Sequence, residues 1–103
     1  MSKKILLLAI FFTLKFNFVQ SDEKFELGKD IFLNVGNCGA CHSLKDAGAV
    51  ANVGPNLNKI KPDIGRVINA VTNGIGVMPS FLGILSEEEI NAVAYYVSES
   101  SID

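Results

Sequence analysis

Hydrophobic and polar residues alternate with the period of an amphipathic helix in three stretches of the chain. Within each stretch the apolar side chains recur three, four and seven positions apart, so they fall on one helical face. The three sets are Phe25, Leu27, Ile31, Phe32 and Val35; Ile64, Val67, Ile68 and Val71; and Ile90, Val93, Ala94 and Val97, flanked by Tyr96. The pattern predicts an all-α domain with helices over residues 23–35, 62–73 and from residue 86 onward.

Local signals mark the ends of these helices. Gly36 and Asn37 close the first one. Pro62 suits the first position of the second helix, with Asp63 at the positive end of the dipole, and Gly74 would supply a left-handed stop.

The third helix begins with a capping box formed by Ser86 and Glu89. Glu87 and Glu88 lie in its first turn, where the helix dipole favours negative charge. The acidic run would also serve as a docking patch, although capping is sufficient to explain it.

Gly28 interrupts the first helix at a cost of about 1 kcal/mol relative to alanine. Such a glycine usually permits close approach of a second backbone. We therefore expect the first and last helices to cross, with Gly28 and Phe32 meeting the region of Val93 and Tyr96.

The first 21 residues have the composition of a secretory signal peptide. Lys3 and Lys4 precede a ten-residue apolar segment, and four of the seven phenylalanines fall within the first 18 residues. Val19 and Ser21 are small enough to precede a cleavage site, which predicts a mature chain of residues 22–103. A retained membrane anchor is the alternative, but the apolar run is shorter than the roughly 20 residues that span a bilayer.

Cleavage would leave an acidic chain. Six basic residues would remain against eleven acidic ones, for a net charge of −5. This balance disfavours nucleic acid as a partner. No second apolar run is long enough to span a membrane, so the mature chain is expected to be soluble and periplasmic.

The strongest chemical signal is the sequence Cys38-Gly39-Ala40-Cys41-His42. Its C-x-x-C-H spacing is the attachment signature of haem c, in which two thiols add to the vinyl groups of one porphyrin and the histidine ligates the iron. A thioredoxin-like redox pair would require a preceding strand, for which the sequence gives no pattern. A structural zinc site requires four ligands, and the chain holds only two cysteines and one histidine.

Two irregular segments accompany this motif. Residues 43–60 have no lasting helical or strand period, which is reasonable if the loop wraps a haem rather than its own side chains. Within it, the carbonyl of Pro55 could accept a hydrogen bond from His42 and fix the tautomer of the ring. An ordinary Gly-Pro turn is the alternative.

The second irregular segment, residues 73–81, contains Met78, which is the sole methionine besides Met1. A methionine in an apolar loop is often only core packing. Because no second histidine exists, a thioether is the soft ligand that suits the other face of the iron. We therefore expect His42 and Met78 as the two axial ligands.

Taken together, these residues resemble the class I c-type cytochromes, and in particular the small monohaem branch similar to cytochrome c6. The similarity covers essentially all of residues 22–103. It rests on Gly28-x-x-Ile31-Phe32, Cys38-Gly39-Ala40-Cys41-His42, Gly54-Pro55-Asn56-Leu57, Asn73-Gly74 ahead of Met78-Pro79, and the stretch from Leu85 to Val97.

The resemblance implies the cytochrome c fold, with crossing terminal helices and loops wrapped around one covalent haem c. It implies attachment through Cys38 and Cys41 and axial ligation by His42 and Met78. Pro55 and Leu57 would complete the cofactor-binding set.

We expect a monomeric periplasmic one-electron carrier without catalysis of its own, docking transiently with other redox proteins. The alternatives are a haem enzyme or gas sensor with an open iron, and a cytochrome subunit of a periplasmic dehydrogenase or oxidase. The loop over residues 43–53 departs from the plant and algal form and is closer to bacterial cytochromes, so the partner stays open. Arg66 and Lys59 are candidates to neutralise a haem propionate.

Overall fold

The computed structural model describes residues 22–103, and the predicted signal peptide with its cleavage site near Ser21 lies outside the described residues. Residues 22–30 form an α-helix. After it come η1 (Ile31–Val35), η2 (Cys38–Ala40), β1 (Ser43–Leu44), η3 (Lys45–Ala47), β2 (Ala49–Val50), α2 (Leu57–Ile60), α3 (Ile64–Asn73) and α4 (Glu87–Ser100). The all-α prediction is confirmed, apart from one small hairpin. None of the described helices has the length and apolar character needed to cross a membrane.

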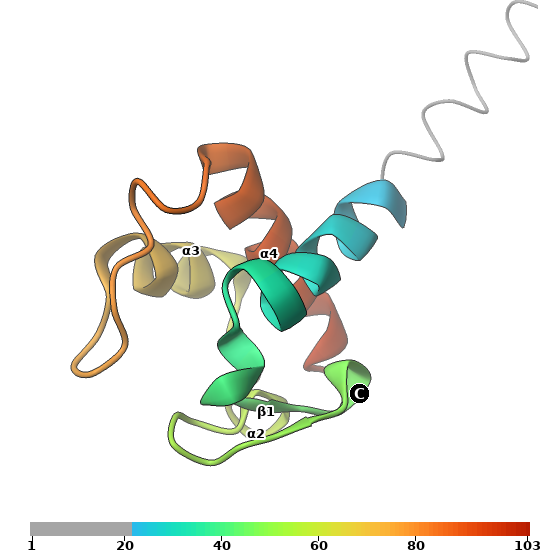
Figure 1. Ribbon diagram of the computed structural model, residues 1–103. Helices are drawn as coiled ribbons and strands as arrows, with labels where there is room; N and C mark the ends of the chain where they lie inside the picture. The colour runs from blue at the N-terminus through green and yellow to red at the C-terminus, as the bar shows by residue number, and fades with distance from the viewer. Residues whose placement is uncertain (1–21) are drawn as a thin grey trace, which may run out of the picture.

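The N-terminal helix crosses α4, as Figure 1 shows. A Cβ atom on Gly28 would overlap the backbone oxygen of Ala92 and lie 2.6 Å from Cβ of Tyr96. The rings of Phe25 and Phe32 pack edge-on against Tyr96, with centroid distances of 4.9 and 5.9 Å. The predicted crossing is therefore confirmed, and Gly28 is what lets the two backbones approach.

The N-terminal helix ends where the sequence predicted, but through a π turn. The N–H of Gly36 donates to the carbonyl of Ile31, five residues back, and Asn37 adopts a left-handed conformation with φ of 51°. The extra residue in this turn rotates the end of the helix, and Val35 is exposed rather than buried as predicted. Leu27 is also exposed, because the contact with α4 is narrower than the apolar stripe.

Helix α3 begins two residues later than predicted. Asp63 is its N-cap, with the side chain accepting from the N–H of Arg66, and Pro62 precedes the helix instead of opening it. Ile64 consequently lies at the outer edge of the first turn and is exposed, whereas Val67 and Val71 are buried.

The start of α4 matches the prediction. Ser86 Oγ accepts from the N–H of Glu89, and the Glu89 side chain accepts from the N–H of Ser86, which completes the capping box. Ile90, Val93, Ala94 and Val97 are all buried, and Tyr96 lies at the centre of the crossing with no exposed surface.

Residues 43–60 contain more regular structure than the sequence predicted. Strands β1 and β2 pair antiparallel, with Ser43 opposite Val50 and Leu44 opposite Ala49. The short helix α2 follows, capped by the side chain of Asn56. Elements of two to four residues are too short to produce a detectable period, which explains why the pattern missed them.

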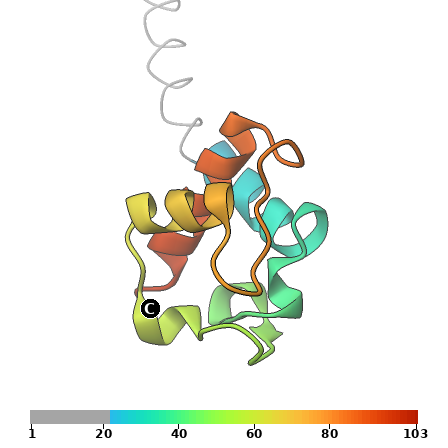
Figure 2. The same cartoon turned by 90° about the vertical axis from the view of Figure 1, so that its left-hand side faces the viewer.

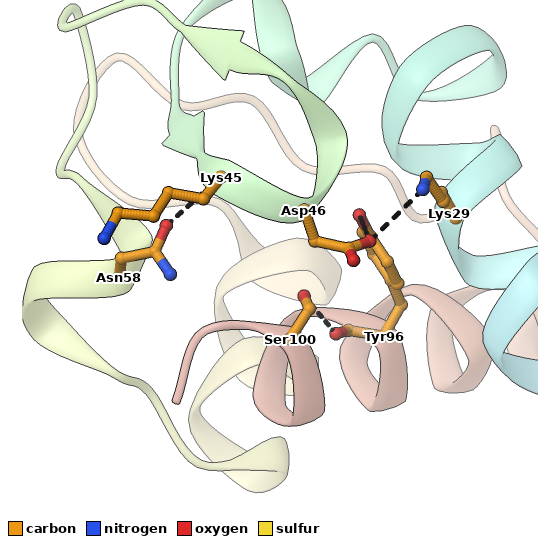
Figure 3. A network of polar contacts seen from close by, with 6 residues as sticks. All are labelled: Lys29, Lys45, Asp46, Asn58, Tyr96 and Ser100. Atoms are coloured by element: carbon orange, nitrogen blue, oxygen red, sulfur yellow. Dashed lines mark hydrogen bonds and ion pairs between the residues drawn. The ribbon is translucent and has the colours of Figure 1, made fainter. Parts of the chain in front are cut away.

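A polar network fastens η3 to the crossing helices (Figure 3). The hydroxyl of Tyr96 donates to Asp46 over 2.7 Å, and Lys29 lies 3.3 Å from the same carboxylate. The Tyr96 hydrogen bond, and after it Lys29, hold the pKa of Asp46 below its usual value. Burial, and then the hydrogen bond to Asp46 and its charge, raise the pKa of Tyr96 well above its ordinary value, so that its hydroxyl stays a donor.

Replacing Gly28 tests the helix crossing. Gly28→Ala is expected to lower the free energy of unfolding by about 1–3 kcal/mol, because the added methyl group overlaps the backbone of α4. Urea unfolding measures the change. Gly65→Ala in α3 is the matched control, since its nearest neighbour, Asp63 Oδ1, would lie at an ordinary 3.5 Å and alanine is the better helix former. Equal stability of both variants would contradict the assigned role of Gly28.

Candidate cofactor site

A cavity of about 670 Å³ lies between α3, α4, the residues after η1 and the loop that follows α3. Its size is in the range of known cofactor sites. All six residues predicted to bind a cofactor line it: Cys38, Cys41, His42, Pro55, Leu57 and Met78. In Figure 1 the gold-to-orange loop that contains Met78 lies to the left of the teal-to-green segment around His42, and residues of both reach the cavity.

The Cys-x-x-Cys-His segment is held in a compact turn. The N–H groups of Cys41 and His42 both donate to the carbonyl of Cys38, over 3.1 and 3.0 Å. Gly39 packs tightly, because a Cβ atom there would lie 3.3 Å from Cβ of Ala49 and 3.6 Å from the ring of Phe32. The turn therefore brings both thiols and the imidazole to one wall of the cavity.

The imidazole of His42 is fixed by the segment around Pro55. His42 Nδ1 lies 2.8 Å from the carbonyl oxygen of Pro55. A carbonyl oxygen can only accept, so the contact requires the proton on Nδ1 and leaves the lone pair of Nε2 free to bind a metal.

Gly54 packs directly against the imidazole ring of His42. Its N–H donates to the carbonyl of Cys41 over 2.7 Å, and a Cβ atom on Gly54 would lie 2.7 to 3.1 Å from Cε1, Nδ1 and Nε2 of His42. The sequence suggested a contact between Pro55 and His42, with an ordinary turn as the alternative, but gave no sign that the missing side chain of Gly54 makes room for an imidazole.

The pKa of the Cys38 thiol does not match that of the reactive cysteine in a redox C-x-x-C pair. Burial raises the pKa of the Cys38 thiol to about 11, and the neighbouring Cys41 adds to the increase. Catalytic thiols of the thioredoxin type have a lowered pKa instead. The raised pKa of Cys38 thus argues against the redox-pair alternative.

Met78 is positioned by backbone contacts in the loop after α3. Ile75 and Met78 exchange two backbone hydrogen bonds, of 3.1 and 2.9 Å. Gly74 has φ of 78°, and a Cβ atom there would lie 2.8 Å from the Met78 carbonyl oxygen. The predicted positive φ is present, although ψ of 161° makes this an extended stop rather than a left-handed one.

The segment after Met78 is tied back to α3. Ser80 Oγ donates to the carbonyl of Thr72 over 2.6 Å, and the N–H of Phe81 donates to that of Val71 over 2.8 Å. Figure 2 shows the orange loop descending from the end of α3 and rising again beside it toward the start of α4. The thioether of Met78 is therefore carried by a loop with several fixed points.

The remaining walls are almost entirely apolar. They include five residues that the sequence predicted only as core, and one further aromatic residue, Phe81. The five are Phe32, Val67, Val71, Val93 and Val97. Among the described residues, Arg66 is the one Lys, Arg, Asp or Glu side chain that lines the cavity. A flat apolar group with two attachment points and one or more acidic substituents fits this set of residues.

Comparisons with known proteins agree with this chemistry. The family model described as cytochrome C oxidase, cbb3-type, subunit III matches residues 23–97. Cytochrome c6 of Bryopsis maxima is 39% identical over 82 residues, which cover 70% of this chain and 86% of that protein. Cytochrome c6 of Leptolyngbya boryana is 37% identical over 71 residues, covering 63% and 81%. The crystal structure of the c-type cytochrome SorU from Sinorhizobium meliloti superposes with a TM-score of 0.74 and 54% identity, covering 78% of this chain and 93% of that one.

Gly54→Ala tests the packing of Gly54 against the imidazole. The added methyl group is expected to displace His42 and break its contact with Pro55, which lowers the free energy of unfolding of the cofactor-loaded protein by about 1–3 kcal/mol. Denaturant titration measures the loss, and nuclear magnetic resonance (NMR) of the single histidine reports the displacement. An unmoved histidine resonance in Gly54→Ala would contradict the role assigned to Gly54.

Proposed function

The chain belongs to the class I c-type cytochromes, whose cofactor is covalently bound haem c, and we propose that it is a periplasmic one-electron carrier with histidine and methionine as axial ligands. The cytochrome c6 relatives support a small electron carrier at the level of the family. When bound, the haem supplies reversible exchange of one electron between ferrous and ferric iron. We propose that residues 22–103 are the mature domain, after removal of a signal peptide that ends near Ser21.

The observation that carries the proposal is the cavity, which gathers the whole predicted cofactor set on its walls. In the proposed arrangement Cys38 and Cys41 hold the haem through two thioethers. His42 ligates the iron through Nε2 while Nδ1 donates to Pro55, which the 2.8 Å contact supports. Met78 supplies a thioether from the other segment, and Leu57 packs against the ring.

The surroundings of the site tune it as an electron carrier. The apolar walls exclude water, and together with the sulfur of Met78 they favour the less charged ferrous form. His42 and Met78 would together hold the iron and leave no position for a substrate, and we propose no catalysis by the chain itself.

Arg66 is the better of the two basic residues proposed to neutralise a haem propionate. It lies in the first turn of α3 and lines the cavity, whereas Lys59 on α2 is not among the lining residues. A guanidinium can bind a carboxylate through two parallel hydrogen bonds, which suits this role.

We propose that redox partners approach at the mouth of the cavity. Ile75 and Val77 line the cavity and are nevertheless 63% and 93% exposed, so one edge is open to solvent. Electron-transfer complexes are small and transient. The acidic mature chain favours partners with a basic docking face, whose association slows when salt is added.

A second candidate function is a subunit of a larger oxidoreductase. The description of the matching family model, which names an oxidase subunit, favours this possibility. Isolation in a stable complex would select the subunit, whereas isolation as a monomer would select the free carrier.

Met78→Ala tests the proposed ligand set. The variant is expected to keep its covalent haem, to lose the near-infrared charge-transfer band of thioether-ligated ferric haem, and to bind carbon monoxide in the reduced state, because the sixth position opens. Leu82→Ala is the matched control, since Leu82 is 70% exposed in the same loop and does not line the cavity. Met78→Ala that keeps the band and excludes carbon monoxide would rule out Met78 as the ligand. Carbon monoxide binding to the unaltered protein would instead favour a haem enzyme or gas sensor.

A further inference from the structure

Two segments of the chain run in parallel past His42 with a constant sequence offset. The N–H of Gly54 donates to the carbonyl of Cys41 over 2.7 Å. One residue further along both segments, His42 Nδ1 lies 2.8 Å from the carbonyl oxygen of Pro55. In both pairs the partners are thirteen residues apart in the sequence.

The same offset is found again three residues further on, at Lys45 and Asn58. Leu44 and Leu57 are both buried in the core, with exposed fractions of 0% and 7%. The N–H of Lys45 then donates to Oδ1 of Asn58 over 2.8 Å, again across thirteen residues. We call this series of three contacts, from Cys41 and Gly54 to Lys45 and Asn58, the ladder; one of its contacts is between backbone groups, and its last is made by the side chain of Asn58.

This last contact matters because α2 has little stability of its own. A helix of four residues is a single turn, which does not persist without external contacts. Pro55 has no N–H with which to fix its own position. The register between α2 and the His42 segment consequently depends on the contacts between them, and Asn58 supplies the polar contact at the end of the ladder.

Asn58 also connects the ladder to the rest of the protein. Its Nδ2 donates to the carbonyls of Ser101 and Asp103, over 3.4 and 3.3 Å. In Figure 3, Asn58 accepts a hydrogen bond from Lys45. The next residue, Asp46, is bound by Lys29 and Tyr96. The η3 turn next to His42 is thus fastened to α2 on one side and to the crossing helices on the other.

We infer that Asn58 is a positioning residue for His42: by accepting from the Lys45 N–H, it keeps α2 in the register that places the Pro55 carbonyl on Nδ1. The inference rests on the proposed function, in which His42 is the proximal haem ligand. A hydrogen bond from Nδ1 fixes the tautomer and raises the basicity of the ligating nitrogen. Asn58 then acts on the iron ligand without touching it.

Two substitutions at Asn58 separate this role from simple fastening of the C-terminus. Asn58→Leu removes the acceptor for Lys45 and the donors to the C-terminal carbonyls, whereas Asn58→Asp keeps the acceptor and loses the donors. The readout is the exchange with deuterated water of the Nδ1 proton of the single histidine, followed by NMR in the reduced, haem-loaded protein. Loss of one such hydrogen bond should make the contact between His42 and Pro55 open at least about threefold more often.

We therefore expect proton exchange at least about threefold faster in Asn58→Leu and within about twofold of the original protein in Asn58→Asp, with the midpoint potential raised only in Asn58→Leu. Ser86→Ala is the control, because losing the capping box lowers the stability of the protein at a distance from the ladder.

Unchanged exchange in Asn58→Leu, equal acceleration in both Asn58 variants, or equal acceleration in Ser86→Ala would each overturn the inference while leaving the proposed function intact. If the original protein gives no Nδ1 proton resonance shifted by the haem ring, His42 is not the ligand, and the proposed function fails first.

Discussion

The constraint on which the structure depends is that its hydrophobic core and its cofactor site share the same side chains. Phe32, Val67, Val71, Val93 and Val97 belong to the buried core and also form walls of the cavity. A chain of this size buries too little surface for a generous margin of stability. A large apolar ring in the cavity completes the packing of these residues, so binding the haem and forming the core are one process.

The irregular segments make sense in this light. A helix in these positions would place its own side chains against the core, whereas an irregular segment leaves room for a flat ring. Each is held by a few specific contacts. His42 contacts the Pro55 carbonyl and packs against Gly54, and the backbone of Met78 packs against Gly74. The network around Asp46 and the ladder that ends at Asn58 then join the His42 segment to the helices. The position of His42 is thus set by long-range contacts rather than by regular structure.

The sequence predicted the features that depend on local spacing. The capping box at Ser86 and the chemistry of Cys38-x-x-Cys41-His42 each rest on residues a few positions apart. The crossing was predicted because Gly28 interrupts the pattern of its own helix. The sequence did not predict features that depend on the three-dimensional arrangement of the helices. Leu27, Val35 and Ile64 were expected to be buried but are exposed, because burial depends on the width of a helix contact and on the π turn. The role proposed for Asn58 could not be predicted from the sequence either, because it depends on a contact with Lys45, thirteen residues away, that exists only after folding.

The central claim is that one haem, joined to Cys38 and Cys41, completes this core. Intact mass spectrometry under denaturing conditions, on protein matured in a host that attaches haem c, tests it most directly. The account predicts the mass of the processed polypeptide plus one haem, with the added mass on the peptide that contains both cysteines. The mass of the bare polypeptide, or haem that dissociates on denaturation, would contradict it.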